Sequence, residues 1–202
     1  GCGDGIYINT AGVGTMLAGA DIAPTNITAG MDIIVSGTLG DHAATVMAAR
    51  HDLTLPPEIQ SDSAPLCHLT AAMLAAAPSI AVLRDPTRGG VAASLNELAA
   101  AAHVGILLDE TAIPVRPAVQ GVCDILGFDP LTLANEGKLL AFVPPADTAH
   151  VLAVMHEDPH GREACVIGQT TAEEPGTVGL RTPLGGIRIV DLPLGELVPR
   201  IC

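Results

Sequence analysis

Apolar residues recur along this chain with two different periods, one typical of helices and one typical of strands. The clearest helical stripe, at spacings of four, three and four, consists of Val91, Leu95, Leu98 and Ala102. The clearest strand is the continuous apolar run at residues 80–83, a pattern expected of a strand covered on both faces. The same criteria predict helices at residues 41–51, 65–77, 90–103, 116–126 and 147–157. They predict further strands at residues 32–36, 105–109, 139–143, 164–168, 178–181 and 187–190.

The predicted helices and strands intermingle along most of the chain, but the last three strands follow one another closely. This order favours the α+β class, with a mixed sheet covered by helices and no internal repeat. Residues 1–25 would supply a strand and a connector, residues 26–190 an α+β domain, and residues 191–202 a tail. The prolines and the glycine of that tail disfavour both helix and central strand, so we expect it to project as an arm.

Composition limits the possible partners of the chain. Hydrophobic residues make up 49% of it and aromatic residues only 1%, so the core must consist of Ala, Val, Leu and Ile. The net charge of −13 repels phosphate backbones, so nucleic-acid binding is not expected. No apolar run is long enough to span a bilayer. The five cysteines form no C-x-x-C pair, which argues against a disulfide framework or zinc cluster and favours a reducing, cytoplasmic setting.

The final residue is a cysteine at the end of the arm Pro199-Arg200-Ile201-Cys202. A thiol on a mobile arm can visit more than one site, which suits a carrier of a covalent intermediate. We therefore predict that Cys202 is the one cysteine essential to function. The cysteines predicted to be buried packing thiols, because they lie within apolar helix or strand patterns, are Cys67, Cys123 and Cys165.

The turn Asp85-Pro86-Thr87-Arg88-Gly89-Gly90 lies between a predicted buried strand and a predicted helix, where ligands of α/β layers tend to bind. Its glycines let the backbone approach a ligand closely, and the helix N-terminus that follows favours an anion. Asp85 could hold a magnesium ion, and Arg88 could bind a phosphate or carboxylate. The alternative is an ordinary strand-to-helix turn with a solvated arginine.

Two further turns carry candidate residues. Residues 37–41 have the same strand–turn–helix setting without a basic residue, and the alternative is a tight turn with Asp41 near the helix start. Asn135-Glu136-Gly137-Lys138 precedes the apolar strand at residues 139–143. A carboxylate there, in a partly desolvated cleft among apolar residues, could act as a base. The alternative is a turn that exposes Glu136 and Lys138.

Together these stretches resemble the HypE family of [NiFe]-hydrogenase maturation proteins, which are carbamoyl dehydratases. The matching segments are Tyr7-Ile8-Asn9-Thr10-Ala11-Gly12, Ser36 to His42, Asp85 to Ala92, Ala134 to Leu139 and Pro199-Arg200-Ile201-Cys202. The resemblance implies the fold of aminoimidazole ribonucleotide synthetase, with an N-terminal domain that builds a dimer barrel and an α+β C-terminal domain. This chain would then cover the end of the first domain and all of the second.

The resemblance also implies a reaction. A HypF-like carbamoyltransferase would load a carbamoyl group onto Cys202, ATP would phosphorylate the carbamoyl oxygen, and loss of phosphate would leave a thiocyanate. Glu136 would be the base, and the cyano group would pass to iron on a HypC–HypD-like scaffold complex. The residues expected at ATP are Asp85, Thr87, Arg88, Gly89, Gly90, Asp41 and Asn135, with Asp85 as the candidate Mg²⁺ ligand. The full-length protein would be a cytoplasmic homodimer.

Two other functions stay open. One is an ATP-using enzyme of the same fold that acts on a free small molecule, such as a cyclo-ligase or kinase. A free substrate would need no swinging thiol, so the terminal cysteine argues against it. The other is a non-catalytic module that docks on a partner through its tail. The family's N-terminal acidic residues and an upstream lysine have no counterpart here, so we expect these 202 residues alone to be inactive and to bind ATP weakly.

Overall fold

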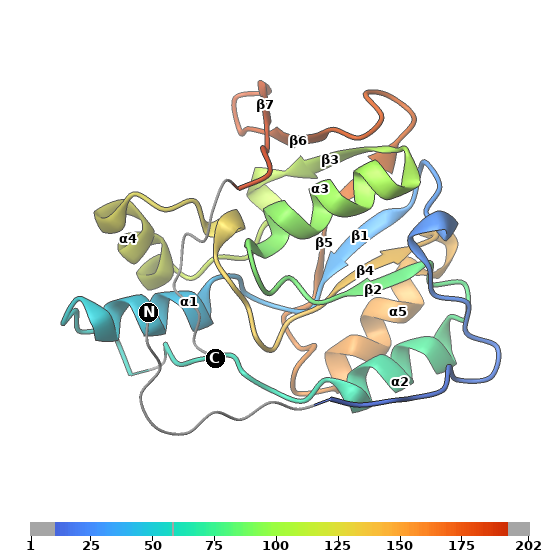
Figure 1. Ribbon diagram of the computed structural model, residues 1–202, viewed down its shortest axis with the longest axis horizontal. Helices are drawn as coiled ribbons and strands as arrows, with labels where there is room; N and C mark the ends of the chain where they lie inside the picture. Colours follow the sequence, from blue (N-terminus) through green and yellow to red (C-terminus); the bar gives the residue numbers. More distant parts are fainter. Residues whose placement is uncertain (1–10, 58, 194–202) are drawn as a thin grey trace.

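One seven-stranded sheet organises the structure, a computed structural model that describes residues 11–57 and 59–193 (Figure 1). Its strands are β1 (Asp32–Val35), β2 (Val82–Arg84), β3 (Gly105–Asp109), β4 (Leu140–Val143), β5 (Cys165–Thr171), β6 (Val178–Arg181) and β7 (Ile187–Ile189). They lie in the order β2-β4-β1-β5-β3-β6-β7. The β3–β6 pair is parallel and the other neighbouring pairs are antiparallel, which confirms the mixed sheet of an α+β fold.

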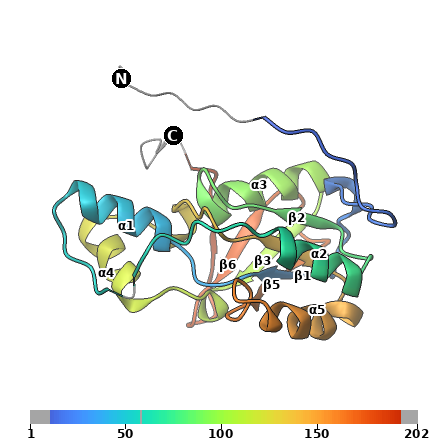
Figure 2. The same cartoon turned by 90° about the horizontal axis from the view of Figure 1, so that it is seen from below.

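Helices pack on both faces of this sheet (Figures 1 and 2). One face carries α3 (Gly90–Ala102), and the other carries α2 (Cys67–Ala76) and α5 (Pro145–Glu157). Beside the sheet, α1 (Asp41–Arg50) and α4 (Pro117–Leu126) pack against each other around a third apolar cluster. Three short 3₁₀ helices complete the described elements: η1 (Pro24–Asn26), η2 (Glu110–Ala112) and η3 (Pro130–Thr132).

The alternation of side chains along each strand divides the core into two layers. In β1, Ile33 and Val35 belong to the cluster under α3, whereas Ile34 between them belongs to the cluster under α2 and α5. The neighbouring strand β4 does the same with Phe142 and Ala141. Successive residues of a strand point to opposite faces, so a short apolar run without polar breaks is what a strand covered on both sides requires.

The five predicted helices are all present, and their ends agree with the prediction to within about two residues. The apolar stripe of α3 is confirmed, because Val91, Leu95 and Leu98 are buried and Ala102 packs against the same cluster. Residues 1–10, within the N-terminal segment expected to supply a strand, and residues 194–202 of the predicted tail lie outside the described residues.

Three expectations need correction. The run at residues 80–83 is covered on both faces as expected, because Val82 belongs to the cluster under α3 and Leu83 packs on the cluster under α2 and α5. Its bounds differ, however, because β2 begins only at Val82 and is an edge strand that ends on the exposed Arg84. Strand β5 continues to Thr171, beyond the predicted end at residue 168, because its polar end pairs with β3. Cys67 is exposed as the first residue of α2, so it is no packing thiol.

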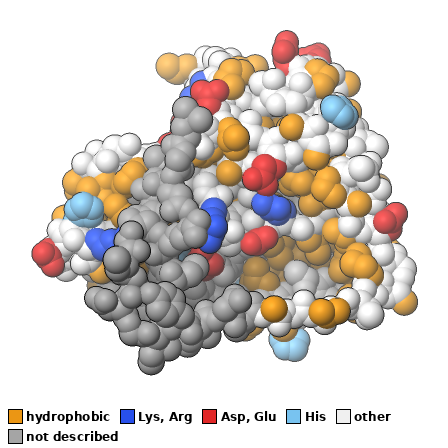
Figure 3. Space-filling model, in the orientation of Figure 1, with side chains coloured by type: hydrophobic (Ala, Val, Ile, Leu, Met, Phe, Trp, Pro, Cys, Tyr) orange, Lys and Arg blue, Asp and Glu red, His pale blue; other side chains and the backbone are white. Residues whose placement is uncertain are grey.

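The described helices and surface can be compared with the requirements of a membrane span and of a nucleic-acid interface. None of the described helices combines the length and the apolar character needed to cross a membrane. On the described part of the face in Figure 3, basic side chains are few and lie beside acidic ones. That distribution offers no continuous basic surface for a phosphate backbone on this part of the molecule.

Candidate active site

Three turns that are far apart in sequence leave the sheet side by side. Strands β1 and β2 both pair antiparallel with β4, and Val35 and Arg84 are each opposite Leu140. The C-terminal ends of β1 and β2 therefore lie beside the N-terminal end of β4, at one end of the strands. We call the place where these turns meet the three-turn site; it comprises residues 36–41, 85–90 and 134–138.

Asn135 joins the three turns. Its side chain is fully buried, and its Oδ1 accepts a hydrogen bond from the Gly40 N–H at 2.8 Å. Its Nδ2 donates to the Pro86 and Leu133 carbonyls at 3.2 and 2.9 Å, and its own backbone N–H donates to Pro86 at 3.2 Å. Only an amide side chain offers both an acceptor and a donor pair in this geometry. Asn135 therefore has a structural role that holds the site together.

The turn at residues 85–90 packs tightly against the segment before Asn135. Gly90 has φ of +62°, and a Cβ there would lie 2.5 Å from the carbonyl oxygens of Leu131 and Leu133. No other residue fits without moving that backbone. Asp85 and Arg88 are exposed, and Arg88 forms no hydrogen bond or ion pair with the described residues that meets ordinary distance criteria. The glycines thus position the turn, and its charged side chains face outward.

Asp41 does not face solvent. The residue is 5% exposed, its Oδ2 accepts the Thr38 hydroxyl, and its Oδ1 lies 3.4 Å from Arg116 Nε. Arg116 immediately precedes α4 and also pairs with Glu163. This carboxylate therefore connects the start of α1 to the start of α4. Such a structural role fits the alternative interpretation of residues 37–41, a tight turn with Asp41 near the helix start. Its direct contact with a nucleotide stays a prediction.

Glu136 is exposed, so the expectation of a partly desolvated cleft around it is wrong for the described residues. Lys138 was expected to be exposed in the alternative interpretation, but only 14% of its side chain is exposed. The backbone N–H of Glu136 donates to Asp62 Oδ1 at 3.0 Å. Glu136 thus lies at the surface, while its backbone N–H is held by the Asp62 carboxylate.

Two helices begin at this site, and their N-termini favour an anion. Gly40 precedes α1 and Gly89 precedes α3, and neither cap supplies a side chain to the free N–H groups of its helix. Unpaired N–H groups and the helix dipole attract phosphate. Asp41 in the first turn of α1 offsets part of that field, whereas α3 has no acidic residue in its first turn. The start of α3 is therefore the better phosphate position.

A magnesium ion at this site would need ligands besides the described side chains. The described residues contain no group of three or more His, Cys, Asp or Glu side chains that could hold a metal ion. Magnesium in nucleotide sites is typically held by one or two carboxylates together with phosphates and water. The exposed Asp85, beside the start of α3, fits a shared site of that kind.

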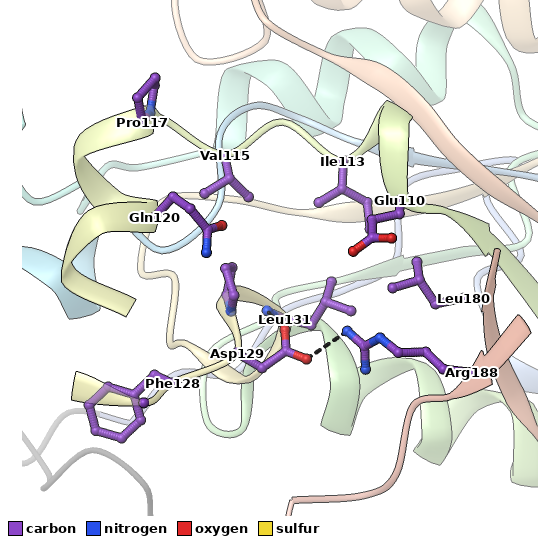
Figure 4. A pocket seen from close by; sticks show the side chains of 12 residues that line it. Glu110, Ile113, Val115, Pro117, Gln120, Phe128, Asp129, Leu131, Leu180 and Arg188 are labelled. Carbon is purple, nitrogen blue, oxygen red and sulfur yellow. Dashed lines mark hydrogen bonds and ion pairs between the residues drawn. The ribbon is translucent and has the colours of Figure 1, made fainter. Parts of the chain in front are cut away.

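A groove of about 690 Å³ lies between α4, η3 and the strands β6 and β7 (Figure 4). Asp129 and Arg188 form an ion pair of 2.7 Å across it, and Phe128 and Gln120 stand at its other side. None of the predicted site residues lines this groove. The groove and the three-turn site are therefore lined by different residues, although Leu131 of the groove also packs against Gly90.

Comparison with known proteins agrees with this geometry. The family described as AIR synthase related protein, C-terminal domain, matches residues 28–181. Carbamoyl dehydratase HypE of Rhodobacter capsulatus is 52% identical over 199 residues, which are 98% of this chain and 58% of that protein. A crystal structure of HypE in complex with ATP has a TM-score of 0.83 at 40% identity, covering 90% of this chain and 55% of that one. HypE in a HypE–HypF complex has a TM-score of 0.82 at 39% identity, covering 87% and 57%.

The sheet, its helices and the three-turn site thus define a C-terminal α+β domain of the AIR synthase type, and the chain belongs to that family. Within the family, the predicted resemblance to the carbamoyl dehydratase HypE is confirmed by its sequence relatives and by the solved structures. The chain spans less than two thirds of the length of these relatives.

The structure brings most predicted site residues together, and it adds residues that sequence reasoning missed. The three predicted turns meet, and Cys202 lies outside the described residues. The missed residues are Thr38 and Arg116, which hold Asp41, and Asp62, which holds the Glu136 backbone. Lys138 was named with its turn, but its pairing with Asp62 was not expected. Asp62 lies 74 residues before Glu136 in a loop of ordinary polar composition, so no local pattern could indicate the contact.

Proposed function

We propose that the protein dehydrates a carbamoyl group carried on Cys202 to a thiocyanate, using ATP, and thereby supplies the cyanide ligand for the iron of [NiFe]-hydrogenase. The observation that carries the proposal is the Asn135 network, which places Glu136 beside the turn at residues 85–90. A base and a phosphate-binding turn in one place are what the dehydration needs. The similarity to HypE, including a form solved with ATP, supports the same chemistry.

The chemistry explains why both groups are needed. The carbamoyl oxygen is a poor leaving group until it carries a phosphoryl group transferred from ATP, with ADP released. The C–O bond then breaks and phosphate leaves with that oxygen, while the two N–H hydrogens of the carbamoyl group are lost as protons. The nitrogen electron pairs form the C≡N bond, and the S–C bond to the cysteine stays intact. No redox step occurs.

We assign the roles as follows. Cys202 carries the carbamoyl group, and Glu136, exposed beside the turn at residues 85–90, accepts an N–H proton. Thr87, Arg88, Gly89 and Gly90 border the phosphates at the start of α3, where the exposed side chain of Arg88 would bind a phosphate oxygen. Asp85 would ligate magnesium, which would neutralise phosphate charge when bound. Asn135 and Asp41 complete the nucleotide side of the site.

The proposed partners follow from the same reaction. A carbamoyltransferase must load the thiol, and a HypE–HypF complex among the solved structures supports a HypF-like partner. The thiocyanate must then be consumed by an iron scaffold complex of the HypC–HypD type. We further propose a cytoplasmic setting and a homodimer of the full-length protein.

The test is the mass of the C-terminal tail peptide of the full-length protein after incubation with a HypF-type carbamoyltransferase, carbamoyl phosphate and ATP. In a sample stopped after loading, before ATP is supplied for the dehydration, the peptide should have gained one carbamoyl group. With ATP it should then lose the mass of one water. Cys202→Ala should gain neither adduct, and an adduct that persists in this variant would contradict the role of Cys202. A parental tail that is never modified would contradict the proposed function.

A further inference from the structure

A long loop between α1 and α2 reaches the three-turn site. The structure describes no helix or strand in residues 51–57 and 59–66, and a compact domain rarely keeps a loop of this length without a function. Its end, residues 61–64, lies against the turn that carries Glu136. The proposed reaction so far gives this loop no role.

One carboxylate of the loop contacts both sides of that turn. Asp62 Oδ1 accepts the Glu136 N–H at 3.0 Å, and Asp62 Oδ2 lies 3.6 Å from Lys138 Nζ. The Asp62 side chain is only 3% exposed, and its Oδ2 is buried without a hydrogen-bond partner among the described residues. A buried carboxylate is costly unless it is paired, so these two contacts explain why Asp62 is tolerated there.

The backbones of the loop and the turn also touch directly. A Cβ at Gly137 would lie 1.7 Å from the Asp62 carbonyl oxygen and 2.9 Å from the Ala64 nitrogen. Any side chain at Gly137 would therefore push the loop away from Glu136. The neighbouring Ser61 hydroxyl bonds His42 Nδ1 at 2.8 Å, which anchors the same loop to the first turn of α1. The loop is thus held by Ser61 at α1 and by Asp62 at the turn that carries Glu136.

We propose that Asp62 is a positioning residue for Glu136: its carboxylate holds the Glu136 backbone and neutralises Lys138, so that the Glu136 side chain projects toward the carbamoyl group. This inference deepens the proposed function and rests on it. A general base must lie within hydrogen-bond reach of the proton that it accepts. A displacement of about 1 Å can lower a rate about 100-fold. Asp62 acts through Glu136 and does not touch the reacting atoms.

The experiment compares variants of the full-length protein in two steps: carbamoyl loading on the tail cysteine, and ATP-dependent conversion to thiocyanate, both followed by tail-peptide mass in single turnover. Asp62→Ala should load at the parental rate but convert about 100-fold more slowly. Asp62→Asn keeps an oxygen that can accept the Glu136 N–H, so it should convert at least about tenfold faster than Asp62→Ala. Amide exchange of the Glu136 N–H should rise in Asp62→Ala and stay protected in Asp62→Asn.

A double variant separates positioning from stability. Asp62→Ala with Lys138→Met removes both members of the ion pair, so no buried charge is left alone, while the Glu136 N–H still lacks its acceptor. This protein should fold and still convert slowly. The matched control is Asp158→Ala, which removes a carboxylate that accepts the His160 N–H outside the site and should convert at the parental rate.

Parental conversion in Asp62→Ala, or equal losses in Asp62→Ala and Asp62→Asn, would overturn the inference. A parental protein that loads the carbamoyl group but never forms thiocyanate would instead contradict the proposed function, so the two failures are distinguishable.

Discussion

At the residue scale, one fully buried amide holds the candidate site together. Asn135→Ala would leave the Gly40 N–H and the Pro86 and Leu133 carbonyls without their side-chain partner. The Pro86 carbonyl keeps the backbone N–H of residue 135, so two buried groups lose their partner, the Gly40 N–H and the Leu133 carbonyl. Each costs about 1–3 kcal/mol when left unsatisfied, so the free energy of unfolding should fall by about 2 kcal/mol or more. Urea unfolding of the full-length protein measures this loss.

Asn26→Ala is the control for this prediction. Asn26 also donates to a backbone carbonyl, that of Asp21, but this hydrogen bond is exposed and water can replace it. The control should lose less than about 1 kcal/mol. Equal losses in the two variants would show that the Asn135 network contributes no special stability.

A second residue-scale prediction concerns the buried thiol in α4. Burial, with smaller contributions from the Asp124 and Asp129 carboxylates, raises the pKa of Cys123 from 9.0 to about 11. The folded protein therefore keeps this proton at a pH where the unfolded chain has lost it. The stabilisation is complete below about pH 9 and is lost as the pH rises toward 11. The free energy of unfolding should fall over this range more steeply in the parental protein than in Cys123→Ala, and identical slopes would contradict the assignment.

Single residues also show where sequence reasoning ends. The sequence indicated Glu136 and Asn135, because both lie in a turn before an apolar strand. It could not indicate that Asn135 is buried and Glu136 exposed, because both are polar and adjacent. It could not find Asp62 either, since that contact depends on a loop that returns to the site after α1. Tertiary contacts over such separations leave no local pattern.

At the element scale, the start of α3 depends on a glycine. Gly90→Ala would place a methyl group 2.5 Å from two carbonyl oxygens at a φ of +62°, so it should destabilise the protein by several kcal/mol. Gly121→Ala is the matched control, because Gly121 lies inside α4 with no atom within 4 Å of the added Cβ. The control should stabilise the protein by about 0.5–1 kcal/mol. Thermal unfolding of both variants checks the pair, and an equally stable Gly90→Ala would contradict the packing.

Elements with a strong apolar period were predictable, and elements defined by pairing were not. The stripe of α3 and the run of β4 are visible in the sequence because burial selects apolar side chains at fixed spacings. The end of β5 carries Gln169, Thr170 and Thr171, yet it is strand because it pairs with β3. Thr170 is buried there with its hydroxyl bonded to Thr28 and Met31. Because its hydroxyl is hydrogen-bonded, Thr170 can be buried although it is polar, so the hydrophobic pattern of the sequence could not predict its burial.

At the scale of the whole molecule, sheet topology creates the site. Strands β1 and β2 flank β4 and run antiparallel to it, so the C-terminal ends of β1 and β2 lie beside the N-terminal end of β4. The sequence predicted each turn but not the order of the strands in the sheet, because strands that pair are far apart in the sequence. The start of α3 supplies the anion-favouring end, and the loop before α2 supplies Asp62. We therefore expect the three turns and the Asp62 loop to act as one unit.

The tail-peptide mass of Glu136→Gln, followed over time beside the parental protein, tests this account most directly. Both proteins should take up one carbamoyl group on Cys202. The parental peptide should then lose one water when ATP is added, whereas the Glu136→Gln peptide should stay carbamoylated and convert about 100- to 10,000-fold more slowly. If Glu136→Gln formed thiocyanate at the parental rate, Glu136 would not be the base and the three-turn site would not be the place of dehydration.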